Sequence, residues 1–264
     1  MIRNQHSEDA TTETRFARVN NPAIVVSVIV NYYDRESTID RVVERLLGQS
    51  LSLCAPDQLE VIVVDDGSER GELHRTLPDP VIYLWQRKRR YGISRAKNTG
   101  ARIANGRYLV FLDADILVVP DYIDAVLRAF EQWDRRTIHC GYIADYRGAG
   151  EPDPRTEFGV WENPGAPTGR FLQLAGGNMA IAKDLFFETE GFDEDLIHGG
   201  VEDLLFGYQL GLLPRTSIRF DRQMLGTHLP HPPSLAHANV AASWEIVRAK
   251  YPDFHRRYIV DGLR

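Results

Sequence analysis

Cysteine is scarce in this sequence: Cys54 and Cys140 are the only two among 264 residues. They form neither a CxxC pair nor a metal-ligand cluster, so we expect two reduced thiols in a cytoplasmic protein. A long apolar run is also lacking, because none reaches the roughly 20 residues that a membrane-spanning helix needs. The polar N-terminus lacks the apolar core of a signal peptide. We therefore expect no transmembrane segment and no signal peptide.

An excess of positive charge is missing too. Lys and Arg number 31 against 37 Asp and Glu, which gives a net charge of -6 and makes a general nucleic-acid surface a poor prediction. The basic run 87–90 is a local exception. It favours a solvated loop, although it would also suit anionic donors or the lipid headgroups of a peripheral membrane contact.

The first half of the chain alternates between strand and helix patterns. Apolar and β-branched runs predict strands, and apolar residues at helical spacing predict helices between them. The expected strands are 23–30, 59–68, 81–86 and 107–115, and the expected helices are 36–50, 92–106 and 120–133. Ser37 or Thr38 would cap the first helix and Gly106 would close the second. The alternation predicts an α/β fold with a mostly parallel sheet and helices on both faces.

The second half is less regular. Segment 146–169 is rich in glycine and proline, which predicts a long loop region of the kind that forms lids or substrate walls. After it we expect strand 178–182, helix 183–189, helix 201–212, strand 216–224, loop 225–234 and a final helix 236–250.

Polar residues follow three of the expected strands. Asn31 and Tyr33 follow the first strand, Asp65 and Asp66 end the second, and Asp113 ends the fourth. Ligands of open α/β sheets bind beyond the carboxyl ends of the strands, so these residues could line one crevice. For Asp65 and Asp66 a simple turn is the alternative, because Asp and Gly are favoured in turns.

Asp113 and Asp115 are candidate metal ligands. Carboxylates at i and i+2 point to the same side of an extended segment, and two hard oxygen donors suit Mg²⁺ or Mn²⁺. A solvated or capping pair of aspartates is the alternative. His228 and His231 lie in a loop rich in proline, where a histidine can complete a metal site begun by carboxylates. A lone loop histidine is more often simply solvated.

Arg95 and Asn98 are neighbours on one face of the helix 92–106. An arginine near a helix N-terminus is badly placed for the helix dipole. An anionic ligand would account for it, and so would a salt bridge to one of the acidic turns.

Two glycine-containing motifs mark the second half. Glu202 and Asp203 stand at a helix start, where the helix dipole alone favours them, and the functional alternative is a general base. Gly177 and Asn178 belong to a Gly-Gly-Asn motif in which permissive backbone precedes a carboxamide that can bond a sugar hydroxyl. Each motif is weak by itself.

Taken together, the motifs resemble those of GT-A glycosyltransferases of family 2, across about residues 24–230. Segment 176–212 also resembles the acceptor-side region of galactosyltransferases and polypeptide N-acetylgalactosaminyltransferases. The matching stretches are "VSVIVNYYDRESTI", "VIVVDDGS", "GISRAKNTGARIANGRYLVFLDAD", "GGNMAIAKDLFFETEGFDED" and "GGVEDLLFGYQL". The resemblance implies a GT-A fold over 21–235, with a nucleotide-binding half 21–145 and an acceptor half 146–235. A polar tail 1–20 would precede it, and a C-terminal helix and tail 236–264 would follow.

The resemblance also implies roles for single residues. The nucleotide base would meet Asn31, Tyr33 and either Asp65 or Asp66. Arg95 and Asn98 would serve the donor diphosphate or neighbouring loops, and Gly177 and Asn178 would border the donor sugar and the acceptor. Asp113 would face the ribose or donor sugar, and Asp115 and His228 would bind the metal. Asp203 would be the catalytic base, with Glu202 holding donor sugar or acceptor.

The implied reaction is metal-dependent, inverting sugar transfer from a nucleotide-sugar donor. UDP is the first expectation for the nucleotide, with dTDP and GDP open, and the cation would be Mn²⁺ or Mg²⁺. The acceptor would be a natural product, a peptide or a glycan precursor. The alternatives are a retaining transferase on the same fold, a sugar-1-phosphate nucleotidyltransferase, and a sugar-nucleotide-binding protein without turnover.

Overall fold

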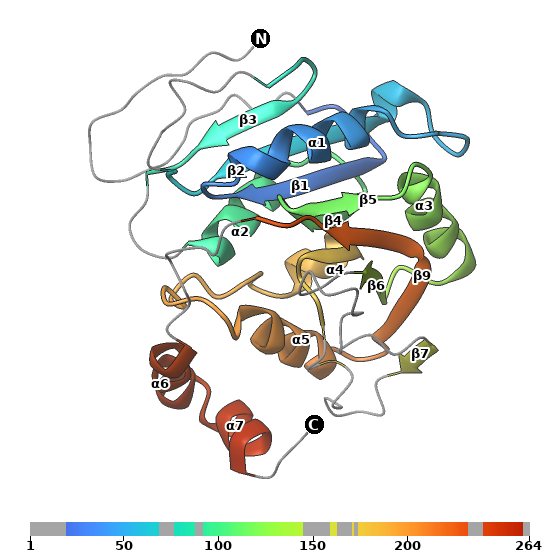
Figure 1. Cartoon of the computed structure of the whole chain (residues 1–264). Helices are drawn as coiled ribbons and strands as arrows, with labels where there is room; N and C mark the ends of the chain where they lie inside the picture. The colour runs from blue at the N-terminus through green and yellow to red at the C-terminus, as the bar shows by residue number, and fades with distance from the viewer. Residues whose placement is uncertain are drawn as a thin grey trace.

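A computed structural model describes residues 20–68, 77–87, 92–144, 159–162, 171, 174–231 and 240–260. Within them the chain forms a nine-stranded sheet covered by helices (Figure 1). The strands are β1 (Val26–Tyr32), β2 (Leu59–Asp65), β3 (Ile82–Trp85), β4 (Tyr108–Asp113), β5 (Ile116–Val118), β6 (Thr137–Ala144), β7 (Gly159–Glu162), β8 (Asn178–Ala182) and β9 (Ser217–His228). The helices are α1 (Glu36–Leu47), α2 (Ile93–Ile103), α3 (Tyr122–Gln132), α4 (Lys183–Glu188), α5 (Glu202–Leu212), α6 (Val240–Lys250) and α7 (Pro252–His255), with short turns η1 (Pro56–Gln58) and η4 (Arg256–Val260).

The strands follow the order β3-β2-β1-β4-β8-β6-β9-β5, and β7 pairs with β9. β3, β2, β1 and β4 are parallel, which confirms the arrangement expected for the first half. Beyond β4 the sheet is mixed, because β8 runs antiparallel to both β4 and β6. The parallel register sets Tyr32 beside Asp65 and Asn31 beside Asp113. The carboxyl ends of β2, β1 and β4 therefore meet at one edge, as the sequence predicts.

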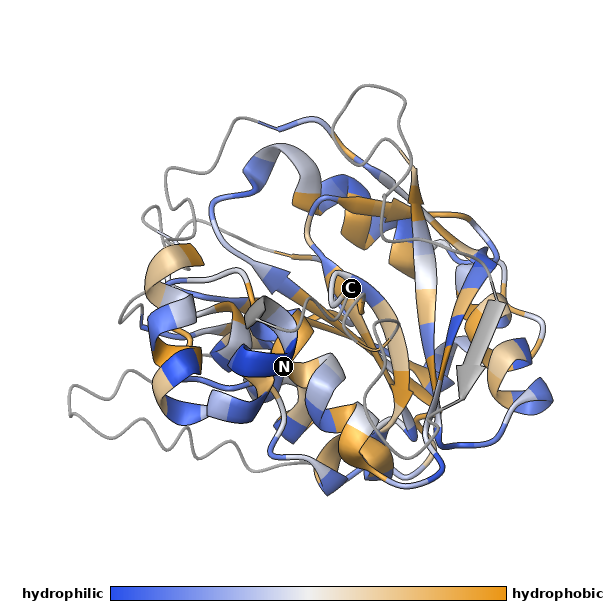
Figure 2. Ribbon diagram, turned by 90° about the horizontal axis from the view of Figure 1, so that it is seen from below, coloured by the Kyte–Doolittle hydropathy of each residue, from blue (hydrophilic) through white to orange (hydrophobic). Residues whose placement is uncertain are grey.

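The β-branched runs become the most buried strands. Val28, Ile29 and Val30 are fully buried in β1, since α2 packs on one side of the parallel strands and α1 covers the other (Figure 1). Figure 2 shows hydrophobic residues along the strands and on the inward helix turns, with hydrophilic turns outside. Burial of this surface, worth about 25 cal/mol per Å² of apolar area, is the main force that fixes the site-bearing edge.

A second, smaller cluster of buried side chains joins the end of the chain to α5. It contains Leu196, Val201, Leu205, Tyr208, Val247 and Phe254. The expected final helix is confirmed as α6, and α7 follows it; Figure 1 shows both helices beyond α5, away from the sheet. The C-terminal helices thus pack on the helix that begins with Glu202 and Asp203.

Three boundary predictions are wrong. α1 begins at Glu36, so Thr38 lies inside the helix, and its hydroxyl donates to Ala114 O at 2.8 Å instead of capping. α2 ends at Ile103, and Gly106 lies beyond it, where a Cβ would overlap Ser27 of β1. The strand expected over 216–224 continues to His228, because its last residues pair with β5 and β6.

Other parts of the sheet were not predicted. β5 and β6 have no counterpart among the expected elements, and β7 lies inside the segment expected to be a loop. The rest of segment 146–169 lies outside the described residues. β5 is only three residues long, and such short strands form because a neighbouring strand supplies their hydrogen bonds.

The two thiols are free, as expected, with Cys140 buried and Cys54 half-buried. Among the residues described above, no helix combines the length and the apolar character that crossing a membrane requires.

Stability should fall in acid because of His139. This residue is fully buried on β6, and burial lowers the pKa of its imidazole to about 3. Below pH 6.5 the unfolded chain takes up a proton there that the folded chain does not, so the free energy of unfolding decreases as pH falls from about 6.5 toward 3. The slope is at most about 1.4 kcal/mol per pH unit. The free energy of unfolding, measured by urea denaturation at several pH values, should depend less steeply on pH for His139→Leu than for the wild type. An equal pH dependence in the two proteins would contradict the assignment.

Candidate active site

Asn31 and Asp113 meet at the edge where the parallel strands end. The Asn31 Nδ2 group donates to Asp113 Oδ1 at 3.0 Å, and the Asp113 amide donates to the Gly177 carbonyl at 3.0 Å. A Cβ at position 177 would overlap the Asp113 carboxylate, so glycine is required for this close approach. The structure thus brings these three predicted residues together.

Lys97 occupies the centre of the site, although the motif analysis did not single it out. Its side chain is 1% exposed, and its Nζ lies 3.2 Å from Asp203 Oδ1. The Gly176 amide donates to Asp203 Oδ2 at 3.0 Å, so both oxygens of this carboxylate are held. Burial lowers the pKa of Lys97, but the carboxylates of Asp203, Asp113 and Glu202 outweigh it and hold that pKa above its usual value. Lys97 therefore stays charged.

A sequence signal for Lys97 does exist. In α2 it shares the inward helical stripe with Ala96, Gly100 and Ala101, all of them buried. A lysine in a stripe of small residues is unusual, since a buried ammonium needs a compensating charge. The partner, Asp203, stands far along the chain, and only the fold reveals it.

Glu202 and Asp113 carry raised pKa values. Burial, followed by the neighbouring charge of Asp203, raises the pKa of Glu202 to about 7. Burial raises the pKa of Asp113 as well, and Lys97 opposes that rise. Within the described residues, Glu202 Oε2 is buried without a hydrogen-bond partner. A carboxyl group of this kind can bind or exchange a proton near neutral pH.

Asp115, His228 and His231 form a group of metal-ligand type. One ligand atom from each lies within 4.8 Å of the others. His231 Nε2 lies 3.1 Å from Asp115 Oδ2, and His228 Nε2 lies 3.9 Å from Asp115 Oδ1. The pairing of β5 with β9 creates this group, and the Leu229 amide donates to the Asp115 carbonyl at 2.7 Å. The sequence offered His228 and His231 as alternative metal ligands, and both belong to this group.

Arg35 also contacts Asp115, with its Nε 3.3 Å from Oδ2. Burial raises the pKa of Asp115, but the hydrogen bond from His231 and the charges of His228 and Arg35 lower that pKa by more than burial raises it. The net shift is downward. Asp115 is therefore an ionised carboxylate, as a metal ligand must be.

Asp113 is not part of this group, and a metal shared by Asp113 and Asp115 stays a prediction. β4 ends at Asp113, and the chain turns at residues 114–115 before β5. The i, i+2 rule holds only for extended backbone. The hydrogen bond from Thr38 to Ala114 O fixes the turn, which directs Asp113 toward Asn31 and Asp115 toward the histidines.

Asp65 and Asp66 have structural partners. Asp65 accepts from the Ser68 amide at 2.8 Å and from the Tyr83 hydroxyl, and Asp66 accepts from Gln86 and from the Gly92 amide, each at 2.8 Å. Both carboxylates are buried. The turn interpretation therefore accounts for them, and they fix the strand end and the start of α2.

Asn98 and Asn178 hydrogen-bond to groups within the protein. For Asn98 this agrees with the expected alternative of serving a neighbouring loop, and the donor roles of both residues stay predictions. Asn98 donates to Phe192 O at 2.7 Å and to Glu194 at 3.0 Å, and it accepts from the Phe192 amide, so it holds a neighbouring loop. Asn178 is fully buried, accepts from Tyr122 and donates to two carbonyls. The side-chain amides of both residues thus hydrogen-bond to other groups of the protein.

Two other predicted donor ligands, Tyr33 and Arg95, follow β1 and begin α2. Tyr33 is half-buried directly after β1, next to the strand that ends at Asn31 and Tyr32. Arg95 donates to the Arg87 carbonyl at 3.1 Å, across the start of α2.

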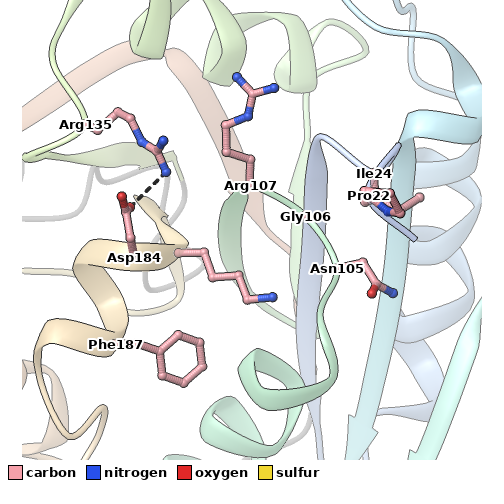
Figure 3. A pocket seen from close by; sticks show the side chains of 9 residues that line it. Pro22, Ile24, Asn105, Gly106, Arg107, Arg135, Asp184 and Phe187 are labelled. Atoms are coloured by element: carbon pink, nitrogen blue, oxygen red, sulfur yellow. Dashed lines mark ion pairs between the residues drawn. The ribbon is translucent and has the colours of Figure 1, made fainter. Parts of the chain in front are cut away.

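A cavity of about 430 Å³ lies at the opposite edge of the sheet, before β1 and β4 (Figure 3). Figure 3 shows Arg135 paired with Asp184 there, at 3.0 Å, and Phe187 nearby. Lys183 donates to the Ala104 carbonyl. The cavity contains none of the predicted site residues, and its ion pairing suits a structural role.

The comparisons agree with the geometry. The family model for glycosyl transferase family 2 matches residues 27–194, which is more than half of the chain. The chain therefore belongs to this family. The match ends before Glu202 and Asp203.

Two of the similar proteins are sugar transferases by name. Validoxylamine A glucosyltransferase of Streptomyces hygroscopicus subsp. limoneus is 28% identical over 244 residues, covering 78% of this chain and 52% of that protein. Probable N-acetylgalactosaminyltransferase 9 of Caenorhabditis elegans is 29% identical over 212 residues, covering 69% of this chain and 36% of that protein. The chain spans about half or less of the length of these relatives.

The fold is shared with a solved glycosyltransferase of the GT-A type. S. aureus TarS 1-349 in complex with UDP-GlcNAc superposes with a TM-score of 0.62 at 19% identity, covering 86% of this chain and 65% of that one. This likeness confirms the fold class expected from the sequence.

Removing the Lys97 charge should destabilise the protein. Lys97→Met leaves Asp203 and Asp113 without their buried counter-charge, and breaking a buried pair typically costs about 3–5 kcal/mol. In urea denaturation, the free energy of unfolding should fall less in the double variant K97M/D203N than the sum of the decreases in the two single variants. A loss below about 1 kcal/mol for Lys97→Met, or strict additivity, would contradict the coupling.

Proposed function

We propose that this protein is a metal-dependent, inverting glycosyltransferase that moves a sugar from a UDP-sugar to an acceptor hydroxyl. The observation that carries the proposal is that Asp113 and Asp203 lie against the adjacent glycines Gly177 and Gly176, while Asp115 of the group with His228 and His231 follows Asp113 by two residues. A metal-ligand group and a carboxylate suited to proton transfer thus flank one strand end. The UDP-GlcNAc complex of TarS supports UDP as the nucleotide.

The donor set fits a divalent cation. Asp115 offers a carboxylate oxygen, and His228 and His231 offer imidazole nitrogens. Two imidazoles suit Mn²⁺ better than Mg²⁺, which prefers oxygen ligands. A bound cation would offset the charge that grows on the leaving diphosphate. We assign these three residues as its ligands, with Asp113 placed for the ribose or donor sugar.

Asp203 is the proposed general base. Lys97 Nζ lies 3.2 Å from one oxygen of its carboxylate, and the Gly176 amide donates to the other at 3.0 Å, so the carboxylate is fixed in orientation. The acceptor oxygen transfers its proton to Asp203 and forms a bond to the anomeric carbon, while the bond from that carbon to the diphosphate oxygen breaks on the opposite side. This single displacement inverts the anomeric configuration. Glu202, with one buried oxygen unused among the described residues, would bind a sugar hydroxyl.

The division of labour along the chain follows from this assignment. Residues 21–145 would bind the nucleotide and 146–235 would receive the acceptor. The C-terminal segment 236–264 would support the acceptor side. Relatives with different printed acceptors give no basis for choosing among a natural product, a peptide and a glycan precursor.

A retaining transferase on the same fold is the nearest alternative. NMR of the product separates the two, because the inverting mechanism yields the opposite anomeric configuration to that of the donor. Membership of a glycosyltransferase family disfavours the nucleotidyltransferase alternative, and release of UDP from a UDP-sugar distinguishes the enzyme from a binding protein without turnover.

Asp203→Asn should retain UDP binding but lose turnover. General-base catalysis is typically worth roughly 10²–10⁴-fold. The variant removes the proton acceptor and one counter-charge of Lys97, while the residues proposed to hold the metal stay unchanged. UDP release from UDP-sugars measures turnover, and calorimetry with Mn²⁺ measures UDP affinity. Asp184→Asn, at the opposite edge, is the control and should behave as the wild type. Unchanged turnover at equal UDP affinity would exclude Asp203 as the base.

UDP should stabilise the protein in a metal-dependent manner. At 100 times its dissociation constant, a ligand adds about 2.7 kcal/mol to the free energy of unfolding. A thermal-shift assay should show this gain with UDP and Mn²⁺, and EDTA, Asp115→Asn or His228→Gln should abolish most of it. Comparing His228→Gln with His231→Gln tests each histidine separately. An equal shift in EDTA and in Mn²⁺ would refute the metal site.

A further inference from the structure

The turn before α5 has an unusual backbone. Gly199, Gly200 and Val201 have φ angles of 70°, 63° and 132°. Glycine adopts such angles readily, but a β-branched residue does not. A strained conformation of this kind persists only where the surroundings hold it. The turn leads directly into Glu202 and Asp203, so its shape decides where both carboxylates point.

Helix α6 contacts this turn through one face. Ser243 is fully buried, and its hydroxyl donates to the Gly199 carbonyl at 2.9 Å. Val247, one helical turn later on the same face, is fully buried in the cluster that contains Val201. The helix thus bonds to the first residue of the turn and shares an apolar cluster with its last.

Independent contacts fix α6 and α7 to the rest of the protein. The Tyr251 hydroxyl donates to Asp193 Oδ2 at 2.8 Å. Lys250 Nζ lies 2.9 Å from Asp193 Oδ1 and 2.7 Å from Asp195 Oδ2. Phe254 packs on Tyr208 of α5, with ring centroids 4.8 Å apart. These contacts dock the C-terminal helices without involving the turn 199–201.

We propose that α6 clamps the turn 199–201, and that Ser243 is a positioning residue that holds Asp203 and Glu202 in their reactive places. The catalytic part of this inference rests on the function proposed above for Asp203. Ser243 lies beyond the segment that matches the family, which ends at residue 194. The C-terminal helices would thus act on the acceptor side of the site through the backbone, without touching substrate.

Ser243→Ala tests the clamp, and Tyr251→Phe is the matched control. Each removes one side-chain hydroxyl from the same docked segment, but only Ser243 bonds to the turn. For Ser243→Ala we expect the rate of amide hydrogen exchange in 199–204 to rise at least about tenfold. Without the hydrogen bond from Ser243, less free energy is needed to open the turn. The kcat for UDP release from UDP-glucose with Mn²⁺ should fall roughly tenfold, with the KM for the donor and the UDP affinity within twofold of the wild type.

The control should separate positioning from general stability. Tyr251→Phe should lower Tm while exchange in 199–204 and kcat stay within twofold of the wild type. Ser243→Cys, with a thiol of similar size and weaker donor strength, should give an intermediate kcat. The clamp would be overturned if Ser243→Ala had the same exchange rates and the same kcat as the wild type. It would also be overturned if kcat fell in both Ser243→Ala and Tyr251→Phe in proportion to the decrease in Tm. If the wild type releases no UDP, the proposed function fails, and the exchange measurement still decides whether Ser243 holds the turn.

Discussion

The buried Lys97 ammonium is the interaction on which the site depends. It lies among Asp203, Asp113 and Glu202, which come from different parts of the chain. An unpaired buried charge is costly, so α2, β4 and α5 can pack together only when the ammonium and its carboxylates meet. The packing of the fold and the electrostatics of the site therefore impose the same requirement.

Close approach of backbone to carboxylates is the second constraint. Gly176 and Gly177 bring the chain against Asp203 and Asp113, where any side chain at either position would overlap a carboxylate oxygen. The space gained lets the amide of Gly176 bond to Asp203 directly. A preorganised donor of this kind needs no rearrangement when charge changes during a reaction, which is the condition for efficient electrostatic catalysis.

The group of Asp115, His228 and His231 shows how one turn separates two neighbouring carboxylates. Asp113 and Asp115 are neighbours in sequence, yet the turn at 114–115 assigns one to the carboxylate cluster and the other to His228 and His231. The histidines arrive on the extended end of β9, which pairs with β5 beside that turn. A cation and a general base could thus act on the two sides of one donor.

The sequence by itself determined the alternation of strands and helices, the polar edge formed by Asn31, Asp65 and Asp113, and the family resemblance. These follow from local patterns, because side-chain periodicity reports burial over a few residues. Only the tertiary structure decided that Asn98 and Asn178 serve the packing, that Lys97 pairs with Asp203, and that β5 and β6 exist. Their hydrogen bonds and counter-charges come from residues far away in the chain, so no local pattern contains them.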